Sequence, residues 1–356
     1  MIGRLAAAGA AAIAAVASVR ALRRVAERGG DRLLAGPRTL PDEAALAPAV
    51  DALGGEVVRL RARDGVRLAG RWLPAEHSPS DDATWRPDPH HAILLLHGYS
   101  GSIAPDLVEY GPFLRRIAGV LGLDFRGHGE SEDGPTTFGV LEIEDVAGAL
   151  AWLGERGISR VSLVGTSMGG IVAIASVAVL GDGSLAAADL EPDAPRDPPP
   201  PPRPRIVAIV ADSVAPDLVV PIASRVRGPA SSFVAARLFD AATRRLGADP
   251  RDTEPGRVIG LVEPVPLLLI HGEADEVVPI ADGRRLAAMA GPSAEHWTVP
   301  GAPHSGSHGT DPEAYERRVT EFLRHASADA AGAQPILAAS GPPAPDPEIE
   351  STLVED

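Results

Sequence analysis

Three residue types are missing from this 356-residue sequence: cysteine, lysine and asparagine. Without cysteine, the chain can form no disulfide, no thiolate nucleophile and no cysteine-ligated zinc or iron–sulfur centre. All 33 basic residues are arginine, and 48 acidic residues outnumber them to give a formal net charge of −15. Aromatic residues make up only 4% of the chain. Because an acidic chain with few aromatics suits neither the phosphates nor the bases of nucleic acid, we expect no nucleic-acid partner.

The first 38 residues differ in composition from the rest. Residues 5–19 carry no charge and are mostly alanine, and this run is shorter than the about 20 residues that a membrane-spanning helix needs. Arginines then recur on one helical face over residues 20–28. Three interpretations of residues 1–38 stay open: a signal peptide or uncleaved anchor, an amphipathic helix on a membrane surface, or a helix packed on the domain. Because seven arginines and only two acids precede residue 40, we favour membrane association, with a soluble cytoplasmic protein as the alternative.

Residues 50–326 have the pattern of one α/β domain, and a hydrophobic content of 45% is enough to build its core. Apolar and polar residues alternate over residues 57–75 on both sides of Asp64-Gly65, which predicts a β-hairpin. Short apolar runs then alternate with helix-like stretches, and these runs are residues 92–96, 119–123, 160–165, 206–211, 267–270 and 297–299. Continuous apolar strands separated by helices predict a mostly parallel, twisted sheet with helices on both faces.

Three further segments are expected to lie outside the sheet. Residues 182–204 are rich in proline, which cannot join a helix or sheet interior, and predict a surface insertion. Residues 213–262 separate two core strands and hold many apolar side chains, so they form a candidate cap that either covers an apolar acyl group or simply packs on the sheet. Residues 327–356 are acidic and predict a disordered tail.

The sequence Gly165-Thr166-Ser167-Met168-Gly169-Gly170 carries the strongest chemical signal. It follows an apolar run and precedes a helix-like stretch. In a strand–turn–helix setting, G-x-S-x-G is a nucleophile elbow, and its small residues leave room for the sharp turn. The turn places the Ser167 hydroxyl at a helix N-terminus, where free N–H groups favour negative charge. Ser167 is therefore the candidate nucleophile, and the backbone N–H of Met168 is a candidate donor to the oxyanion.

Four more blocks accompany the elbow, and they are LLLHGYS (94–100), DFRGHGES (124–131), LIHGEADEVVP (269–279) and VPGAPH (299–304). With these blocks, the chain resembles the α/β-hydrolase superfamily from about residue 57 to residue 325. It is most similar to esterase, lipase and serine-aminopeptidase-like single-domain bacterial hydrolases with an N-terminal hydrophobic segment. The resemblance implies an eight-stranded-type sheet with a short cap insertion, and a reaction that needs neither a metal nor an organic cofactor.

The resemblance also implies roles for single residues. The backbone N–H of Tyr99 matches the second oxyanion donor, beside that of Met168. Asp275 matches the triad acid, which orients the base, and His304 matches the base itself. His97, in the first block, is expected to be a structural hydrogen-bonding residue.

Other residues compete for some of these roles. Asp212, at the end of the preceding strand, is the main rival of Asp275, because some relatives place the acid there. The remaining acids near this loop and the other nearby histidines are expected to be solvated or on the surface; they are Glu273, Glu276, Asp282, His296 and His308.

A serine, a histidine and an acid in these blocks imply a hydrolase that forms an acyl-enzyme. We expect a serine hydrolase whose partner is a small-molecule carboxylic ester. A thioesterase or an aminopeptidase with the same triad, and a non-catalytic binding protein on the same scaffold, stay open. An aminopeptidase would need acids to hold the substrate amine, and Glu130, Glu132 and Asp133 are the candidates, although loop acids are usually solvated. The acyl-chain length and the oligomeric state are left open.

Overall fold

A computed structural model describes residues 27–332, except 36–37, 39–42, 77–85, 100, 183–202, 226–229 and 293. Residues 1–26, nearly all of the proline-rich insertion and the acidic tail beyond residue 332 therefore lie outside the described residues. One boundary is corrected. Residues 327–332, expected in a disordered tail, instead continue the last helix. The apolar face of that helix extends its packing past the predicted end, with Ala326 and Ser327 still buried.

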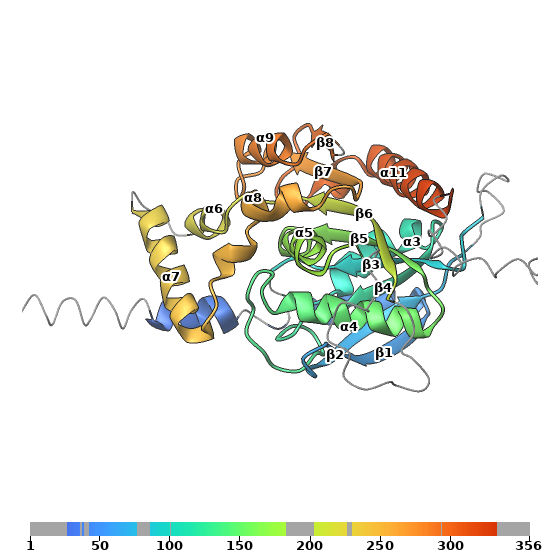
Figure 1. Ribbon diagram of the computed structural model, residues 1–356, viewed down its shortest axis with the longest axis horizontal. Coiled ribbons are helices and arrows are strands. Elements are labelled where there is room, and N and C mark those ends of the chain that lie inside the picture. The colour runs from blue at the N-terminus through green and yellow to red at the C-terminus, as the bar shows by residue number, and fades with distance from the viewer. Residues whose placement is uncertain are drawn as a thin grey trace, which may run out of the picture.

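Eight strands form one sheet in the order β1-β2-β4-β3-β5-β6-β7-β8 (Figure 1). The strands are β1 (Glu56–Arg61), β2 (Arg67–Leu73), β3 (His91–Leu96), β4 (Gly119–Leu123), β5 (Arg160–Thr166), β6 (Arg205–Asp212), β7 (Leu267–Gly272) and β8 (Ala294–Val299). β2 pairs antiparallel with both β1 and β4, and the other neighbours are parallel. The mostly parallel α/β sheet predicted from the sequence is thus confirmed, and its edges stay open.

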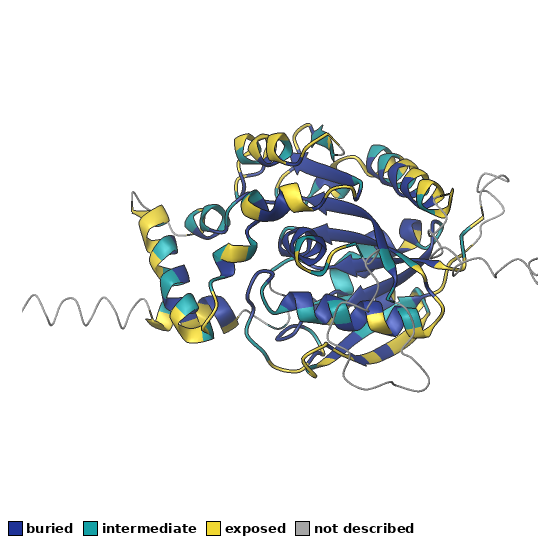
Figure 2. Cartoon of the chain, viewed as in Figure 1, coloured by how far each residue is buried: buried dark blue, intermediate teal, exposed yellow. Residues whose placement is uncertain are grey.

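The hydrophobic pattern explains the place of each strand. In β1, at the edge, Val58 and Leu60 are buried while Arg59 and Arg61 are exposed, as the alternation in the sequence requires. The central strand β3 is buried at all six positions, because helices cover both of its faces. Figure 2 shows the same contrast between the buried sheet and the exposed outer surfaces of the surrounding helices.

Helices cover the two faces of the sheet in two separate cores. α3 (Ala104–Leu114) and α11 (Pro312–Gly332) pack on one face. α4 (Glu142–Glu155), α5 (Met168–Leu180) and α9 (Ile280–Met289) pack on the other. The shorter elements near the sheet are η1 (Glu43–Leu46), α2 (Ala47–Ala52) and α10 (Ser307–Thr310). Within the described ranges, no helix is both long enough and apolar enough to cross a membrane.

The segment between β6 and β7 forms a helical layer beside the sheet. Its elements are α6 (Val219–Ala223), α7 (Ser231–Leu246), η3 (Pro250–Thr253), α8 (Pro255–Val258) and η4 (Ile259–Leu261). Leu218, Ile222 and Phe239 of this layer are buried in the core. Residues 27–35 form a further helix beside α7 (Figure 1), and a Cβ on Gly30 would lie 3.0 Å from Cβ of Ala241. These residues of the N-terminal segment therefore pack on the domain, with Gly30 close to Ala241 and with Leu33 and Leu34 buried.

Candidate active site

The candidate nucleophile sits in a strained turn between β5 and α5. Ser167 has φ 50° and ψ −112°, a backbone conformation that non-glycine residues seldom adopt. Glycines make the turn sterically feasible: a Cβ on Gly169 would lie 2.1 Å from the carbonyl oxygen of Leu96, and one on Gly165 would lie 2.4 Å from the carbonyl carbon of Gly169. The backbone therefore approaches itself as closely as the G-x-S-x-G pattern suggests.

Three side chains from distant parts of the chain meet at this turn. Nε2 of His304 lies 3.0 Å from Oγ of Ser167, and Nδ1 of the same ring lies 2.8 Å from Oδ2 of Asp275. Ser167 follows β5, Asp275 follows β7 and His304 follows β8, so all three lie at the carboxyl ends of parallel strands. The imidazole thus bridges a hydroxyl and a carboxylate at one edge of the sheet.

The local hydrogen bonds keep Asp275 ionised. Its Oδ1 accepts the backbone N–H groups of Val277 and Val278, each at 2.8 Å. Burial alone would raise the pKa of Asp275, but the hydrogen bond from His304 and those from the two N–H groups outweigh it and hold the pKa below its usual value. Because an ionised carboxylate can only accept, Nδ1 of His304 must donate to it. Nε2 is then left free to accept a proton from Ser167.

The rival acid Asp212 makes different contacts. Its Oδ1 accepts hydrogen bonds from the hydroxyls of Ser213 (2.9 Å) and Ser307 (3.0 Å), and its side chain is fully buried. The hydrogen bond to His304 is made by Asp275 instead. Glu273 and Glu276 are exposed, and Asp282 pairs with Arg285.

The two candidate oxyanion donors flank Ser167. Met168 is the first residue of α5, where a helix leaves its N–H groups without an intrahelical acceptor. Within the described part of the chain, no group accepts a hydrogen bond from the Tyr99 N–H. Tyr99 is held by its side chain: the hydroxyl donates to the Leu33 carbonyl at 3.0 Å, and the ring stacks on Phe138 at 5.1 Å.

The contact between Tyr99 and Leu33 was missed by sequence reasoning. It joins the loop after β3 to the helix over residues 27–35, and the Thr136 N–H donates to the Leu34 carbonyl at 2.7 Å in the same region. No local motif marks either contact, because both depend on how the N-terminal helix crosses the domain.

The DFRGHGES block packs against His97, just after β3. Nε2 of His97 accepts the Phe125 N–H at 3.1 Å, in line with the structural role expected for this histidine. Burial lowers the pKa of His97 to about 3, so the ring is neutral.

The three acids considered for amine binding are each paired with an arginine, and these pairs are Glu130 with Arg59, Glu132 with Arg67 and Asp133 with Arg38.

The surface position expected for His308 is wrong. Only 13% of the His308 side chain is exposed, because the ring stacks on Phe113 and lies between Glu109 and Glu316. Its Nδ1 is 3.1 Å from Glu109, and its Nε2 is 3.4 Å from Glu316. His296 is half-buried in β8. The packing of α3 beside α10 and α11 encloses His308, and the sequence gives no sign of it.

His308 should make the stability of the protein depend on pH. The hydrogen bond to Glu109 is the main cause that raises the pKa of His308 above its usual 6.5. A histidine with a raised folded-state pKa contributes stability that is fully present below about pH 6.5 and is lost as the pH rises through the folded-state value. We expect His308→Gln to lower the free energy of unfolding more at about pH 6 than at about pH 9, as measured by urea denaturation. Glu109→Gln should flatten the same slope, and an equal loss at both pH values would contradict this account.

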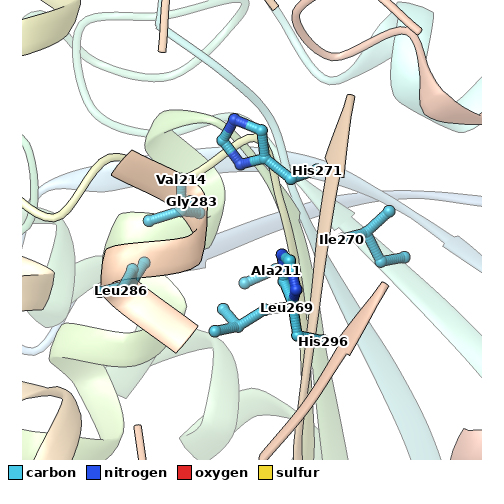
Figure 3. A pocket seen from close by; sticks show the side chains of 8 residues that line it. All are labelled: Ala211, Val214, Leu269, Ile270, His271, Gly283, Leu286 and His296. Carbon is cyan, nitrogen blue, oxygen red and sulfur yellow. The ribbon is translucent and has the colours of Figure 1, made fainter. Parts of the chain in front are cut away.

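A narrow gap lies between β7 and α9 (Figure 3). It is lined by Ala211, Val214, Leu269, Ile270, His271, Gly283, Leu286 and His296 and has no volume open to a water molecule. Nε2 of His271 donates to the Val278 carbonyl at 2.8 Å and so supports the Asp275 loop. A Cβ on Gly283 would lie 2.5 Å from the His271 ring, so only glycine fits there without a shift. This packing is structural and offers no substrate site.

Comparisons with known proteins show the family and the fold of this chain. The uncharacterized protein YfhR of Escherichia coli O157:H7 is 27% identical over 292 residues, which cover 80% of this chain and 84% of YfhR. An esterase of Pyrococcus furiosus superposes with a TM-score of 0.55 at 22% identity, covering 82% of this chain and 96% of the esterase. An alpha-beta hydrolase from Vibrio vulnificus gives a TM-score of 0.57 at 19% identity, covering 82% and 91%. The model of the alpha/beta hydrolase family matches residues 93–318, from the first parallel strand into α11, and the chain therefore belongs to that family.

Proposed function

We propose that this protein is a serine hydrolase that cleaves carboxylic esters through an acyl-enzyme. One observation carries the proposal: the His304 ring lies within hydrogen-bonding distance of both the Ser167 hydroxyl and the Asp275 carboxylate. A serine hydroxyl is a weak nucleophile until a base removes its proton. A base that is oriented on its other side by a carboxylate is suited to that task.

The first half-reaction follows from these contacts. Nε2 of His304 takes the proton from Oγ of Ser167 while Oγ forms a bond to the acyl carbon. Asp275 stabilises the imidazolium and is not itself protonated. The N–H groups of Met168 and Tyr99 donate to the oxyanion of the tetrahedral intermediate, and removing one such donor typically costs about 10²–10³ in rate.

The first half-reaction ends when the alkoxide leaves, and the second returns the enzyme to its starting state. His304 gives its proton to the leaving alkoxide as the bond between the acyl carbon and the alkoxide oxygen breaks. Water then attacks the acyl carbon and gives a proton to His304. The bond from that carbon to Oγ of Ser167 breaks as His304 returns the proton to Oγ, and the carboxylic acid is released. Every proton transfer in this cycle is handled by His304.

An ester is preferred to a peptide because Glu130, Glu132 and Asp133 support no amine site. Each of these acids faces an arginine on the exposed side of the domain. A substrate ammonium group would have to compete with an arginine for each carboxylate. The P. furiosus protein with the same fold is named an esterase, which makes simple esters the first compounds to assay.

Labelling by an active-site phosphonate tests the proposal. The protein is incubated with a p-nitrophenyl phosphonate, and phenolate release and peptide mass are measured. We expect one phosphonyl group per chain, on the peptide that holds Ser167, together with hydrolysis of short-chain p-nitrophenyl esters. His304→Ala should abolish labelling while the protein stays folded. A label on another serine, or folded wild-type protein that neither labels nor turns over any ester, would overturn the proposal.

A comparison of substrates separates the neighbouring activities. Matched oxyester, thioester and aminoacyl amide substrates with one acyl group are compared by kcat/KM. We expect the oxyester to be hydrolysed fastest. A higher kcat/KM for the thioester or for the amide would reassign the substrate class and leave the role of Ser167 in place.

A further inference from the structure

The side chain of Asp212 lies behind the candidate triad and is fully buried at the end of β6. Its backbone carbonyl accepts the Ser167 N–H at 2.8 Å, so this residue touches the elbow directly. Its Oδ1 accepts from the Ser307 hydroxyl at 3.0 Å and from the Ser213 hydroxyl at 2.9 Å. Among the described residues, no group bonds to its Oδ2.

Two hydrogen-bonded paths lead from Asp212 to the segment that follows His304. The first is the direct bond from Ser307. The second passes through Ser213, whose Oγ accepts the Ser305 N–H at 2.9 Å. The Asp212 carboxyl therefore holds the chain at one and at three residues after His304, while its carbonyl holds the N–H of Ser167.

The residues joined in this way have strained backbones. Four non-glycine residues in the described ranges have a positive φ, and three of them are Ser167 (50°), Ser213 (60°) and Ser305 (53°). Such a residue persists only where its surroundings fix it. All three reach Asp212 directly or through one hydroxyl. The carboxyl is placed to hold the turn after His304, and the backbone carbonyl of the same residue holds the turn at Ser167.

We propose that Asp212 is a positioning residue that holds the His304 segment over the Ser167 turn by accepting hydrogen bonds from Ser213 and Ser307. The inference rests on the proposed function, because it assigns Asp212 a part in the same reaction. Burial raises the pKa of Asp212 to about 7, against the lowering by the two hydroxyls. An oxygen of this carboxyl can accept the hydrogen bonds from Ser213 and Ser307 whether or not the group is charged.

Two substitutions of Asp212 distinguish a role as hydrogen-bond acceptor from a role as negative charge. Asp212→Asn keeps an oxygen that can accept from both hydroxyls and removes the charge. Asp212→Ala removes both. We expect Asp212→Ala to lower kcat by about 10–100-fold with KM nearly unchanged, because a shift of about 1 Å in a catalytic group can cost about 10² in rate. We expect Asp212→Asn to stay within about threefold of wild type. Equal losses in the two variants would show that the charge matters, and the proposal would fall.

The donors provide a second check on the same inference. Ser213→Ala and Ser307→Ala each remove one donor, and the double variant should reproduce the loss seen with Asp212→Ala. Adding Asp212→Ala to that double variant should cost little more, because the three residues act as one unit. Additive losses would mean that Asp212 works through other contacts and would overturn the assignment.

A readout that does not depend on catalysis separates this inference from the proposed function. Amide hydrogen exchange of Ser305 should be faster in folded Asp212→Ala than in wild type and unchanged in Asp212→Asn, because its N–H bonds to Ser213 Oγ. If wild type hydrolyses no ester and takes no phosphonate, the proposed function fails. Unchanged Ser305 exchange in Asp212→Ala refutes the positioning role whether or not an ester is cleaved.

Discussion

Ser167→Ala is expected to lower kcat/KM for a p-nitrophenyl ester by at least about 10³. The substitution removes the oxygen that would form the acyl-enzyme and leaves the oxyanion donors and the base in place. The residual rate would come from water attack assisted by those groups. Alanine leaves the fold intact, because it is smaller than serine and Oγ bonds only to His304 among the described residues. The measurement is the steady-state rate of phenolate release, with the purified variant shown to be folded by circular dichroism.

A matched control is available in the helix that follows Ser167. Ser176 lies in α5, is fully buried and has a hydroxyl with no hydrogen-bond partner in the described part of the molecule. Ser176→Ala should keep kcat/KM within about threefold of wild type, since surface and neutral core changes away from the site have small effects. A second test combines Ser167→Ala with His304→Ala, and this double variant should be no slower than Ser167→Ala alone, because the residues act as a unit. Retention of a tenth of the wild-type rate in Ser167→Ala would remove Ser167 from the mechanism.

Arg126→Gln is expected to give the largest loss of stability, about 3–5 kcal/mol in the free energy of unfolding. The guanidinium is buried and bonds to Asp145 at 2.7 and 2.9 Å and to Asp64 at 2.8 and 3.0 Å. Asp145 has no exposed side-chain surface and would be left as an unpaired carboxyl. The loss would loosen the link that joins the loop after β4 to α4 and to the turn between β1 and β2. Urea denaturation at neutral pH measures it.

An exposed arginine provides the control for Arg126→Gln. Arg59 pairs with Glu130, and the two side chains are 57% and 71% exposed. Arg59→Gln should cost below about 1 kcal/mol, because water screens an exposed pair. The double variant Arg126→Met with Asp145→Leu should recover part of the stability lost in Arg126→Gln, since no buried charge then remains unpaired. Similar losses in the free energy of unfolding for Arg126→Gln and Arg59→Gln would show that burial does not determine how much these ion pairs stabilise the protein.

Local sequence patterns were sufficient to predict the strands and the sharp turn at Ser167. The alternation in β1 and β2 and the apolar runs of the later strands predict the parallel sheet, because strand side chains must match the faces that they bury. Gly165 and Gly169 predict the sharp turn at Ser167, because a Cβ at either position would collide with the backbone. These features depend on neighbours in the sequence, so the sequence alone determines them.

The candidate triad could be predicted from the sequence only in part. Ser167 and His304 are separated by 137 residues, and Asp275 and His304 by 29. Nothing in the local pattern brings them together, and the sequence identified Asp275 and His304 only through the blocks shared with a family. The parallel sheet supplies the physical reason for their meeting, because the carboxyl ends of its strands share one edge.

The tertiary structure alone decided the contacts between elements that are far apart in the chain. It enclosed His308 between α3 and α11, bonded Tyr99 to Leu33, and joined Asp212 to two serines near His304. Hydrophobic periodicity shows which face of an element is buried, but not which partner covers that face. A histidine or an aspartate on such a face can therefore be assigned only when the packing of the whole domain is known.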